Sequence, residues 1–261
     1  MDEVRYERLR PKQVVARREA CPVAYVPIGT IEWHGFHNPV GLDTLKAHAL
    51  AVRCARAGGG LVFPPLWYGE CRELALMEAN AADRERIAAG MGLPPENFAP
   101  GYMHRSPQEQ YDNYQKLLLH ALFEVESLGF QVIVLVAGHY PLIDHARAAV
   151  CIYQQGKPRA IAWAFTGYEL VKDEFPEAGD HAGHWETSLL LALDGEGVDL
   201  SELPTDSAAP LVGVGRTQPP VQEASAAYGE RAVRAVVARV TAAVRDRLDN
   251  PARYRGHGAR L

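Results

Sequence analysis

The sequence lacks the features that mark membrane and secreted proteins. No apolar run approaches the roughly 18 residues that a transmembrane helix needs. The segment Met1–Arg5 is charged and has no hydrophobic stretch of the kind found in signal peptides. We therefore expect a cytoplasmic protein without a membrane partner.

Basic clusters and closely spaced cysteines are also missing. The formal net charge is -5 and no block of Lys and Arg appears, which argues against a nucleic-acid partner. The four cysteines lie far apart without a Cys-x-x-Cys pair, as is typical of reduced thiols (Cys21, Cys54, Cys71 and Cys151). With 261 residues, 48% of them hydrophobic, the chain can bury a large core, and we expect a single domain. A soluble enzyme or binding protein for a small molecule fits this composition.

Apolar runs alternate with helical patterns along the chain. The runs that predict strands are Val23–Ile28, Gly60–Phe63, Gln131–Ala137 and Arg159–Phe165. Helical spacing covers Thr44–Ala57, Ser106–Leu128, Leu142–Gln155, Trp185–Leu193 and about Glu223–Leu248. This alternation predicts an α/β fold with a largely parallel sheet.

Two segments add detail to this pattern. Ser106, Pro107 and Glu109 form a capping-box pattern at the start of a helix that Gly129 should end. Met77–Gly101 interrupts the alternation with a short helical stretch and several Gly and Pro residues, so we expect an inserted excursion there. Long loops of this kind are often lids or subunit contacts.

The most informative segment runs from Glu32 to Asp43, directly after the first predicted strand. Between the two acids it contains two His, two Gly and one Pro, which exclude a regular helix. Carboxylate and imidazole groups together are the ligands that first-row divalent metals prefer. A polar surface loop is the alternative, but the carboxyl end of a strand is where α/β folds bind ligands. The position therefore favours a metal site.

Two further clusters contain the same types of side chain. His139 follows the strand Gln131–Ala137 after one glycine, and the run Asp180–Ser188 holds His181 and Glu186 just before a helix. Each cluster alone has an ordinary explanation, namely a hydrogen-bonded structural histidine and an acidic helix start. Three such clusters in one chain favour a shared metal site.

Together these segments resemble the creatininase (creatinine amidohydrolase) family. The matching residues are Glu32-x-His34-Gly35-x-His37-x-Pro39-x3-Asp43, then Gly138-His139 after a strand, and Glu186-Thr187-Ser188 after a His-Gly segment. The resemblance covers most of the chain, from about residue 22 to residue 193. It implies a three-layer α/β/α fold, two divalent ions (zinc, manganese or iron) that activate water, and a homo-oligomer, often a hexamer.

The resemblance also implies which residues hold the ions. By matching position, Glu32, Asp43 and His139 hold one ion. His34 and Asp43 hold the other, so that Asp43 bridges the pair. His181 falls at the place of the family's catalytic histidine, five residues before Glu186.

Neighbouring polar residues are expected to support these groups. His181 would protonate the leaving group, a task that suits a side chain with a pKa near neutrality. Asp180 would orient His181, with an ordinary solvated acid as the alternative. His37 is expected to support the metal ligands by hydrogen bonding.

The chain departs from the family pattern after His139. Creatininase carries a metal-binding Glu two residues after this histidine and many relatives carry a Gly-Gly-Asn run, whereas this chain has Tyr140-Pro141-Leu142. Proline has no side-chain metal ligand, so Glu186 or water would complete the second ligand set. We therefore expect a substrate other than creatinine.

Aromatic side chains near these segments are candidates for substrate contacts: Trp67, Tyr68, Tyr140 and Trp185. Surface or core positions are ordinary explanations for the same residues. If they line a pocket, they would suit a small, polar, ring-shaped substrate.

Three functions stay open at this point. The leading hypothesis is a metal-dependent hydrolase of a small polar, cyclic amide or related carbonyl compound. The second is hydrolysis of a C–C bond in a cyclic diketone of the dehydroinosose type, which some relatives catalyse with the same activated water. The third is a non-catalytic metal-binding relative, which Pro141 motivates.

Overall fold

The computed structural model describes residues 3–69, 81–99, 101–102, 106–215 and 218–255. Within these residues, four parallel strands form one sheet in the order β2-β1-β3-β4. Their bounds are β1 (Val23–Ile28), β2 (Leu61–Val62), β3 (Val132–Ala137) and β4 (Ile161–Thr166). Every residue of β1, β3 and β4 is buried, as expected for strands covered on both faces. The predicted α/β fold with a parallel sheet is confirmed.

The described α-helices are α1 (Pro11–Ala20), α2 (Leu42–Gly58), α4 (Arg84–Gly90), α5 (Pro107–Ser127), α6 (Leu142–Gln155), α7 (Gly167–Val171), α8 (His184–Asp194) and α9 (Ala226–Asp249). Short 3-10 helices lie between them: η1 (Tyr6–Arg8), η2 (Ala81–Asp83), η3 (Pro95–Phe98), η4 (Gly195–Gly197), η5 (Leu200–Glu202), η6 (Val221–Glu223) and η7 (Pro251–Tyr254). Across the described parts of the chain, each helix is too short or too polar to cross a lipid bilayer.

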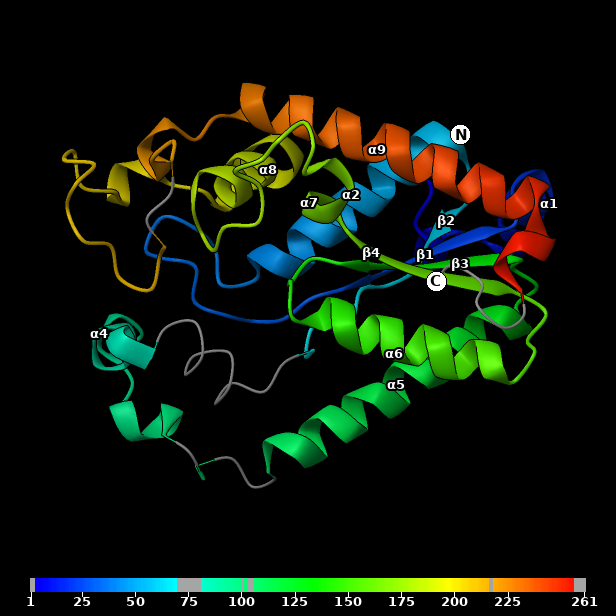
Figure 1. The fold of residues 1–261 in the computed structure, drawn as a ribbon, viewed down its shortest axis with the longest axis horizontal. Coiled ribbons are helices and arrows are strands. Elements are labelled where there is room, and N and C mark those ends of the chain that lie inside the picture. The colour runs from blue at the N-terminus through cyan, green and yellow to red at the C-terminus, as the bar shows by residue number, and fades with distance from the viewer. Residues whose placement is uncertain (1–2, 70–80, 100, 103–105, 216–217, 256–261) are drawn as a thin grey trace.

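Helices cover both faces of the sheet, which gives three layers (Figure 1). Alternate strand residues such as Tyr25 and Val134 point into a core that α2, α8 and α9 cover. The intervening residues, such as Val26 and Leu135, point into a second core under α5 and α6. This alternation follows from the two-residue period of a strand, so each face receives its own set of apolar side chains.

The local signals at α5 act as predicted. The Ser106 hydroxyl accepts the Glu109 N–H at 3.3 Å, and the Glu109 carboxylate accepts the Ser106 N–H at 3.1 Å. Gly129 follows the helix with φ of 88°, a left-handed conformation that glycine adopts without strain. The sequence did not predict α1 or α7, because α1 buries only Val14 and α7 is five residues long.

The described part of the 77–101 excursion packs against the loop after β1. Ile87 of α4 and Phe98 of η3 form a small core with Trp33. Figure 1 places α4 at the end of the molecule beyond the carboxyl ends of the strands. Residues 77–80 and 100 lie outside the described residues, and the expected lid or subunit contact stays a prediction.

The three longest strands end level with one another. Ile28 of β1 pairs with Ala137 of β3, and Ala137 pairs with Thr166 of β4. The segments that follow these strands therefore leave the sheet along one edge. This edge is the usual ligand-binding side of an open parallel sheet.

Candidate metal centre

Two glycines let the first turn of α2 rest directly on this edge of the sheet. A Cβ atom at Gly138 would lie 2.0 Å from the backbone oxygen of Asp43. A Cβ atom at Gly29 would lie 2.4 Å from Oγ1 of Thr44. A side chain at either position would displace α2, so the glycines permit an approach that brings Asp43 beside His139.

The first candidate ligand set consists of Glu32, Asp43 and His139. Nδ1 of His139 lies 3.0 Å from Oε2 of Glu32 and 3.1 Å from Oδ2 of Asp43. The three residues are only 1% to 7% exposed. Apart from this imidazole, no donor among the described residues reaches either carboxylate oxygen of Glu32 or Oδ2 of Asp43. Buried carboxylates without donors are costly, and a bound divalent cation would satisfy them.

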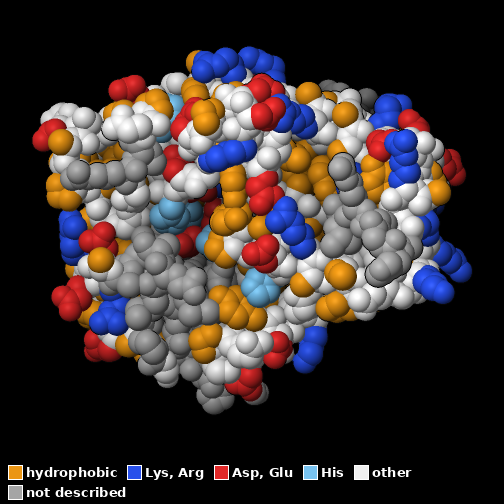
Figure 2. Space-filling view, viewed as in Figure 1, with side chains coloured by type: hydrophobic (Ala, Val, Ile, Leu, Met, Phe, Trp, Pro, Cys, Tyr) orange, Lys and Arg blue, Asp and Glu red, His pale blue; other side chains and the backbone are white. Residues whose placement is uncertain are grey.

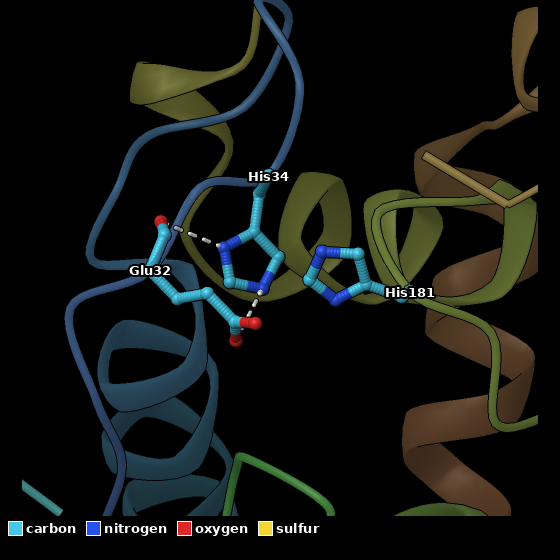
Figure 3. A group of neighbouring side chains, drawn as sticks. All are labelled: Glu32, His34 and His181. Atoms are coloured by element: carbon cyan, nitrogen blue, oxygen red, sulfur yellow. Dashed lines mark hydrogen bonds and ion pairs between the residues drawn. The ribbon is translucent and has the colours of Figure 1, made fainter. Parts of the chain in front are cut away.

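The second candidate set consists of His34, Asp43 and Glu186. Nε2 of His34 lies 3.6 Å from Oδ1 of Asp43 and 3.7 Å from Oε2 of Glu186. Nδ1 of His34 lies 3.1 Å from the backbone oxygen of Glu32 and donates to it, which leaves Nε2 as the free ligand atom (Figure 3). Asp43 thus takes part in both sets, with a different oxygen in each.

Electrostatics within the cluster favour positive charge. Burial opposes protonation of His34, but the carboxylates of Asp43, Glu186 and Glu32 raise its pKa to about 9. Burial would raise the pKa of Asp43, yet the His34 and His139 imidazoles hold it well below its usual range. The metal-free cluster therefore keeps the Asp43 carboxylate ionised beside a protonated His34.

The sequence patterns did not identify one charged residue of the cluster. Lys46 of α2 is buried, forms an ion pair with Glu186, and lies with Nζ 3.6 Å from Oδ1 of Asp43. The spacing could have indicated that Lys46 is buried beside Asp43. Lys46 shares the helical spacing of the buried residues Ala47 and Leu50 and follows Asp43 by three positions. A lysine in a helical pattern is ordinarily read as a surface residue.

Backbone contacts hold the start of α8 against the loop before it. Both carboxylate oxygens of Asp180 accept backbone N–H groups, from Trp185 at 2.8 Å and from Glu186 at 3.0 Å. Oε2 of Glu186 accepts the N–H of Ala182 at 2.8 Å. Burial and then the charge of Glu186 raise the pKa of Asp180 to about 6. Asp180 thus fastens α8, and its expected action on His181 stays a prediction.

His181 faces the ligand clusters from the loop before α8. Nε2 of His181 lies 3.0 Å from the backbone oxygen of Trp33, to which it donates. Its ring centre is 4.7 Å from that of His34, and Figure 3 shows the two rings facing each other beside Glu32. Glu32, His34 and His181 form a third group of close ligand atoms. The backbone bond leaves Nδ1 of His181 available for proton transfer.

His37 belongs to a buried hydrogen-bonded network beside the ligands. Its Nε2 atom lies 3.0 Å from the backbone oxygen of Ala182. Asn38 donates to the hydroxyl of Thr187 at 2.9 Å. The network joins the loop after β1 to the start of α8, and the supporting role expected for His37 stays a prediction.

The clusters line a cavity of about 200 Å³. On the face shown in Figure 2, histidine and acidic side chains meet in a hollow beside hydrophobic side chains. The wall residues include Pro141, Trp185 and Tyr140, whose ring lies 5.0 Å from that of Tyr168. The sequence did not point to Tyr168, because the short helix α7 that carries it was not predicted.

Two of the four aromatic candidates do not line this cavity. Trp67 and Tyr68 are not among its described lining residues. Trp67 packs near Gly41, and Tyr68 is 83% exposed. The structure places only Tyr140 and Trp185 at the cavity wall.

The chain is similar to several characterised hydrolases. It is 29% identical over 190 residues to the mycofactocin precursor peptide peptidase of Mycolicibacterium smegmatis, a match that covers 73% of this chain and 65% of the relative. It is 33% identical over 66 residues to the 3-dehydro-scyllo-inosose hydrolase of Thermotoga maritima, covering 25% of this chain and 21% of the relative. It is 26% identical over 197 residues to the creatinine amidohydrolase of Pseudomonas putida, covering 69% of this chain and 68% of that protein. The chain thus spans less than two thirds of the first two relatives.

Solved structures share the fold. A crystal structure of creatinine amidohydrolase (creatininase) superposes with a TM-score of 0.66 at 23% identity, covering 96% of this chain and 99% of that one. A creatininase variant described as Zn-Zn type superposes with a TM-score of 0.64 at 23% identity, covering 95% and 99%. The structure titled Creatininase Mn gives 0.66 at 23% identity, with the same coverage.

The family assignment rests on a sequence match that spans most of the chain. Residues 7–244 match the family model described as Creatininase: Creatinine amidohydrolase. The motifs around Glu32, His139 and Glu186 lie within this range and form the buried cluster described above. The chain belongs to the creatininase family.

Proposed function

We propose that this protein is a divalent-metal-dependent hydrolase that acts on a small polar carbonyl compound, with an amide as the leading substrate class. The observation that carries the proposal is the position of Asp43, whose two oxygens face different histidines in adjoining ligand sets. Relatives described as a peptidase and as a creatinine amidohydrolase support amide hydrolysis.

Glu32, Asp43 and His139 would hold the first divalent ion, since their ligand atoms converge in a buried space and the carboxylate oxygens of Glu32 and Oδ2 of Asp43 accept no hydrogen bond from the described residues. A bound ion of this kind lowers the pKa of a coordinated water and polarises a carbonyl group. Zinc or manganese fits these ligands, as does iron. If a second ion binds, as the sequence predicts, its ligands would be His34, Asp43 and Glu186.

The protein's own side chains supply the remaining functions. His181, fixed by the Trp33 backbone oxygen, can hold a proton at Nδ1 and pass it to the leaving group. The cavity wall near Tyr140 and Tyr168 would orient the substrate. We also propose a homo-oligomer, which follows from the family resemblance and is checked by light scattering. A cytoplasmic location is proposed from the widely spaced cysteines.

A second reaction has a specific observation in its favour. The segment that matches the 3-dehydro-scyllo-inosose hydrolase is 33% identical, a higher value than over the longer matches to the peptidase and amidohydrolase. Hydrolysis of a C–C bond next to a carbonyl would use the same water and the same proton donor.

Turnover assays separate these possibilities. Metal-loaded and chelator-treated protein would be incubated with creatinine and other lactams, with short peptides, and with a 3-dehydroinosose, and the products followed by mass spectrometry. Metal-dependent cleavage of an amide supports the leading proposal, and opening of only the diketone supports the second. A protein that binds metal but turns over none of these would favour a non-catalytic relative.

A further inference from the structure

Lys46 places a permanent positive charge inside the ligand cluster. Its side chain is only 10% exposed and projects from α2 into the cavity wall. It forms an ion pair with Oε1 of Glu186, and its Nζ lies 3.6 Å from Oδ1 of Asp43. Lysine is ordinarily an ammonium ion at neutral pH, and its position between these two carboxylates stabilises that form.

This ammonium uses the carboxylates that a second divalent ion would need. In the second ligand set, one oxygen of Glu186 pairs with Lys46 and the other accepts the N–H of Ala182. Oδ1 of Asp43, the oxygen facing His34, also faces Lys46. A metal ion in this set would share both carboxylates with a nearby cation in a buried space.

The first ligand set has no such occupant. Oε2 of Glu32 and Oδ2 of Asp43 face the His139 imidazole, and Oε2 of Glu32 also lies 4.0 Å from Nε2 of His34. No lysine or arginine among the described residues pairs with Glu32 or with Oδ2 of Asp43. Pro141 lines the same cavity and offers no side-chain ligand that could strengthen the second set. The two sets thus differ in what they still require: a cation in the first, and none in the second.

Charge balance leads to the same distinction. Glu32, Asp43 and Glu186 have three formal negative charges, and one divalent ion together with Lys46 supplies three positive charges once His34 has lost its proton to metal binding. The carboxylate of Asp180 lies nearby, but the backbone N–H groups at the start of α8 partly compensate it. A second divalent ion would add two further charges beside the Lys46 ammonium, and unbalanced buried charge is unfavourable.

We infer that the Lys46 ammonium takes the place of the second metal ion, so that each chain binds one divalent ion, at Glu32, Asp43 and His139. The inference rests on the proposed metal-dependent function and specifies its cofactor. Because Lys46 also lines the cavity, its charge would stabilise negative charge that develops on a substrate oxygen, a task that a second ion performs in two-metal sites.

Metal counting tests the inference without an activity assay. Purified apoprotein would be titrated with Mn²⁺, the bound equivalents measured by plasma mass spectrometry, and the bound ion examined by electron paramagnetic resonance. We expect one equivalent in the wild type and in Lys46→Arg, with the six-line spectrum of isolated Mn²⁺. Lys46→Met should bind a second equivalent and show the coupled spectrum of two close ions. Lys116→Met, on the exposed surface of α5, is the control and should match the wild type.

The possible results separate this inference from the proposed function. Two equivalents with a coupled spectrum in the wild type would overturn the inference and leave the metal-dependent hydrolase intact. A single equivalent in folded Lys46→Met would also overturn it, because another feature would then exclude the second ion. No bound ion in any variant would overturn both proposals. If Lys46→Met does not fold, the counts for the wild type and Lys46→Arg still decide between one ion and two.

Discussion

The imidazole of His181 is fixed by a hydrogen bond from its Nε2 atom to the backbone oxygen of Trp33, 3.0 Å away. The two residues are far apart in sequence, so this bond ties the loop before α8 to the loop after β1. It also settles which nitrogen carries the structural hydrogen bond. Nδ1 remains for exchange of a proton with a substrate in the cavity.

Replacing His181 should affect turnover far more than metal content. We expect His181→Asn to lower kcat by about 10² to 10⁴, the usual contribution of a general acid or base, while bound metal stays at the wild-type level. The measurement is steady-state kinetics on the substrate found in the turnover panel, combined with a metal count. His120→Asn serves as the control, because His120 is an exposed residue of α5. Unchanged kcat in His181→Asn would remove this residue from the mechanism.

Asp43 should be indispensable for metal binding, because its carboxylate faces both ligand sets. Asp43→Asn preserves the shape of the side chain but removes its charge, and we expect loss of the bound ion and of activity. Metal analysis after dialysis measures the first effect, and circular dichroism checks that the fold is retained. Asp144→Asn provides a matched control in the first turn of α6, where the acid is exposed. Full metal content in Asp43→Asn would contradict the assigned ligand sets.

Metal affinity should increase with pH up to about 9. The pKa of His34 is raised to about 9 by Asp43, Glu186 and Glu32 against the effect of burial, so below this pH the metal-free cluster holds a proton there. A divalent ion bound beside His34 would lower that pKa and expel the proton. Each released proton strengthens apparent binding by about tenfold per pH unit, and the gain ends once His34 is neutral. Chelator competition at several pH values measures the slope, and a flat profile below pH 9 would refute the linkage.

Gly138 should tolerate no side chain, because the backbone of Asp43 occupies the space. We expect Gly138→Ala to lower the free energy of unfolding by about 1–3 kcal/mol, as overpacking typically does, and to weaken metal binding by shifting α2. Urea unfolding and a metal titration measure the two effects. Gly215→Ala is the comparison, since nothing lies within 4 Å of the added methyl group. Equal stability of the two variants would show that α2 can retreat without cost.

Several parts of the centre could be predicted from the sequence because each depends on a local signal. Glu32 and His139 each follow a predicted strand, and this pattern placed them at one edge of the sheet. The level strand ends confirm that placement. Glu186, expected as a replacement ligand, lies 3.7 Å from His34 as the second set requires. Its metal binding, like that of the other ligands, stays a prediction.

Other parts depend on contacts that no local pattern encodes. Lys46 joins the cluster only because α8 brings Glu186 across to α2. Trp67 and Tyr68 follow a strand as the predicted ligands do, but Trp67 packs near Gly41 and Tyr68 is exposed, so neither lines the described cavity. Tyr168 reaches the cavity from a helix too short for its period to be recognised.

Because β1, β3 and β4 end level with one another, changes in the substrate cavity can be distinguished from changes in the candidate metal ligands. The candidate ligands are buried beside these strand ends, whereas Tyr140 is an exposed residue of the cavity wall and Tyr168 stands next to it. Substitutions at the two tyrosines can reshape the substrate cavity without moving the candidate ligands. A single scaffold can thus diversify its substrates while retaining one hydrolytic chemistry, in keeping with family relatives named for a peptide, a cyclic amide and an inosose.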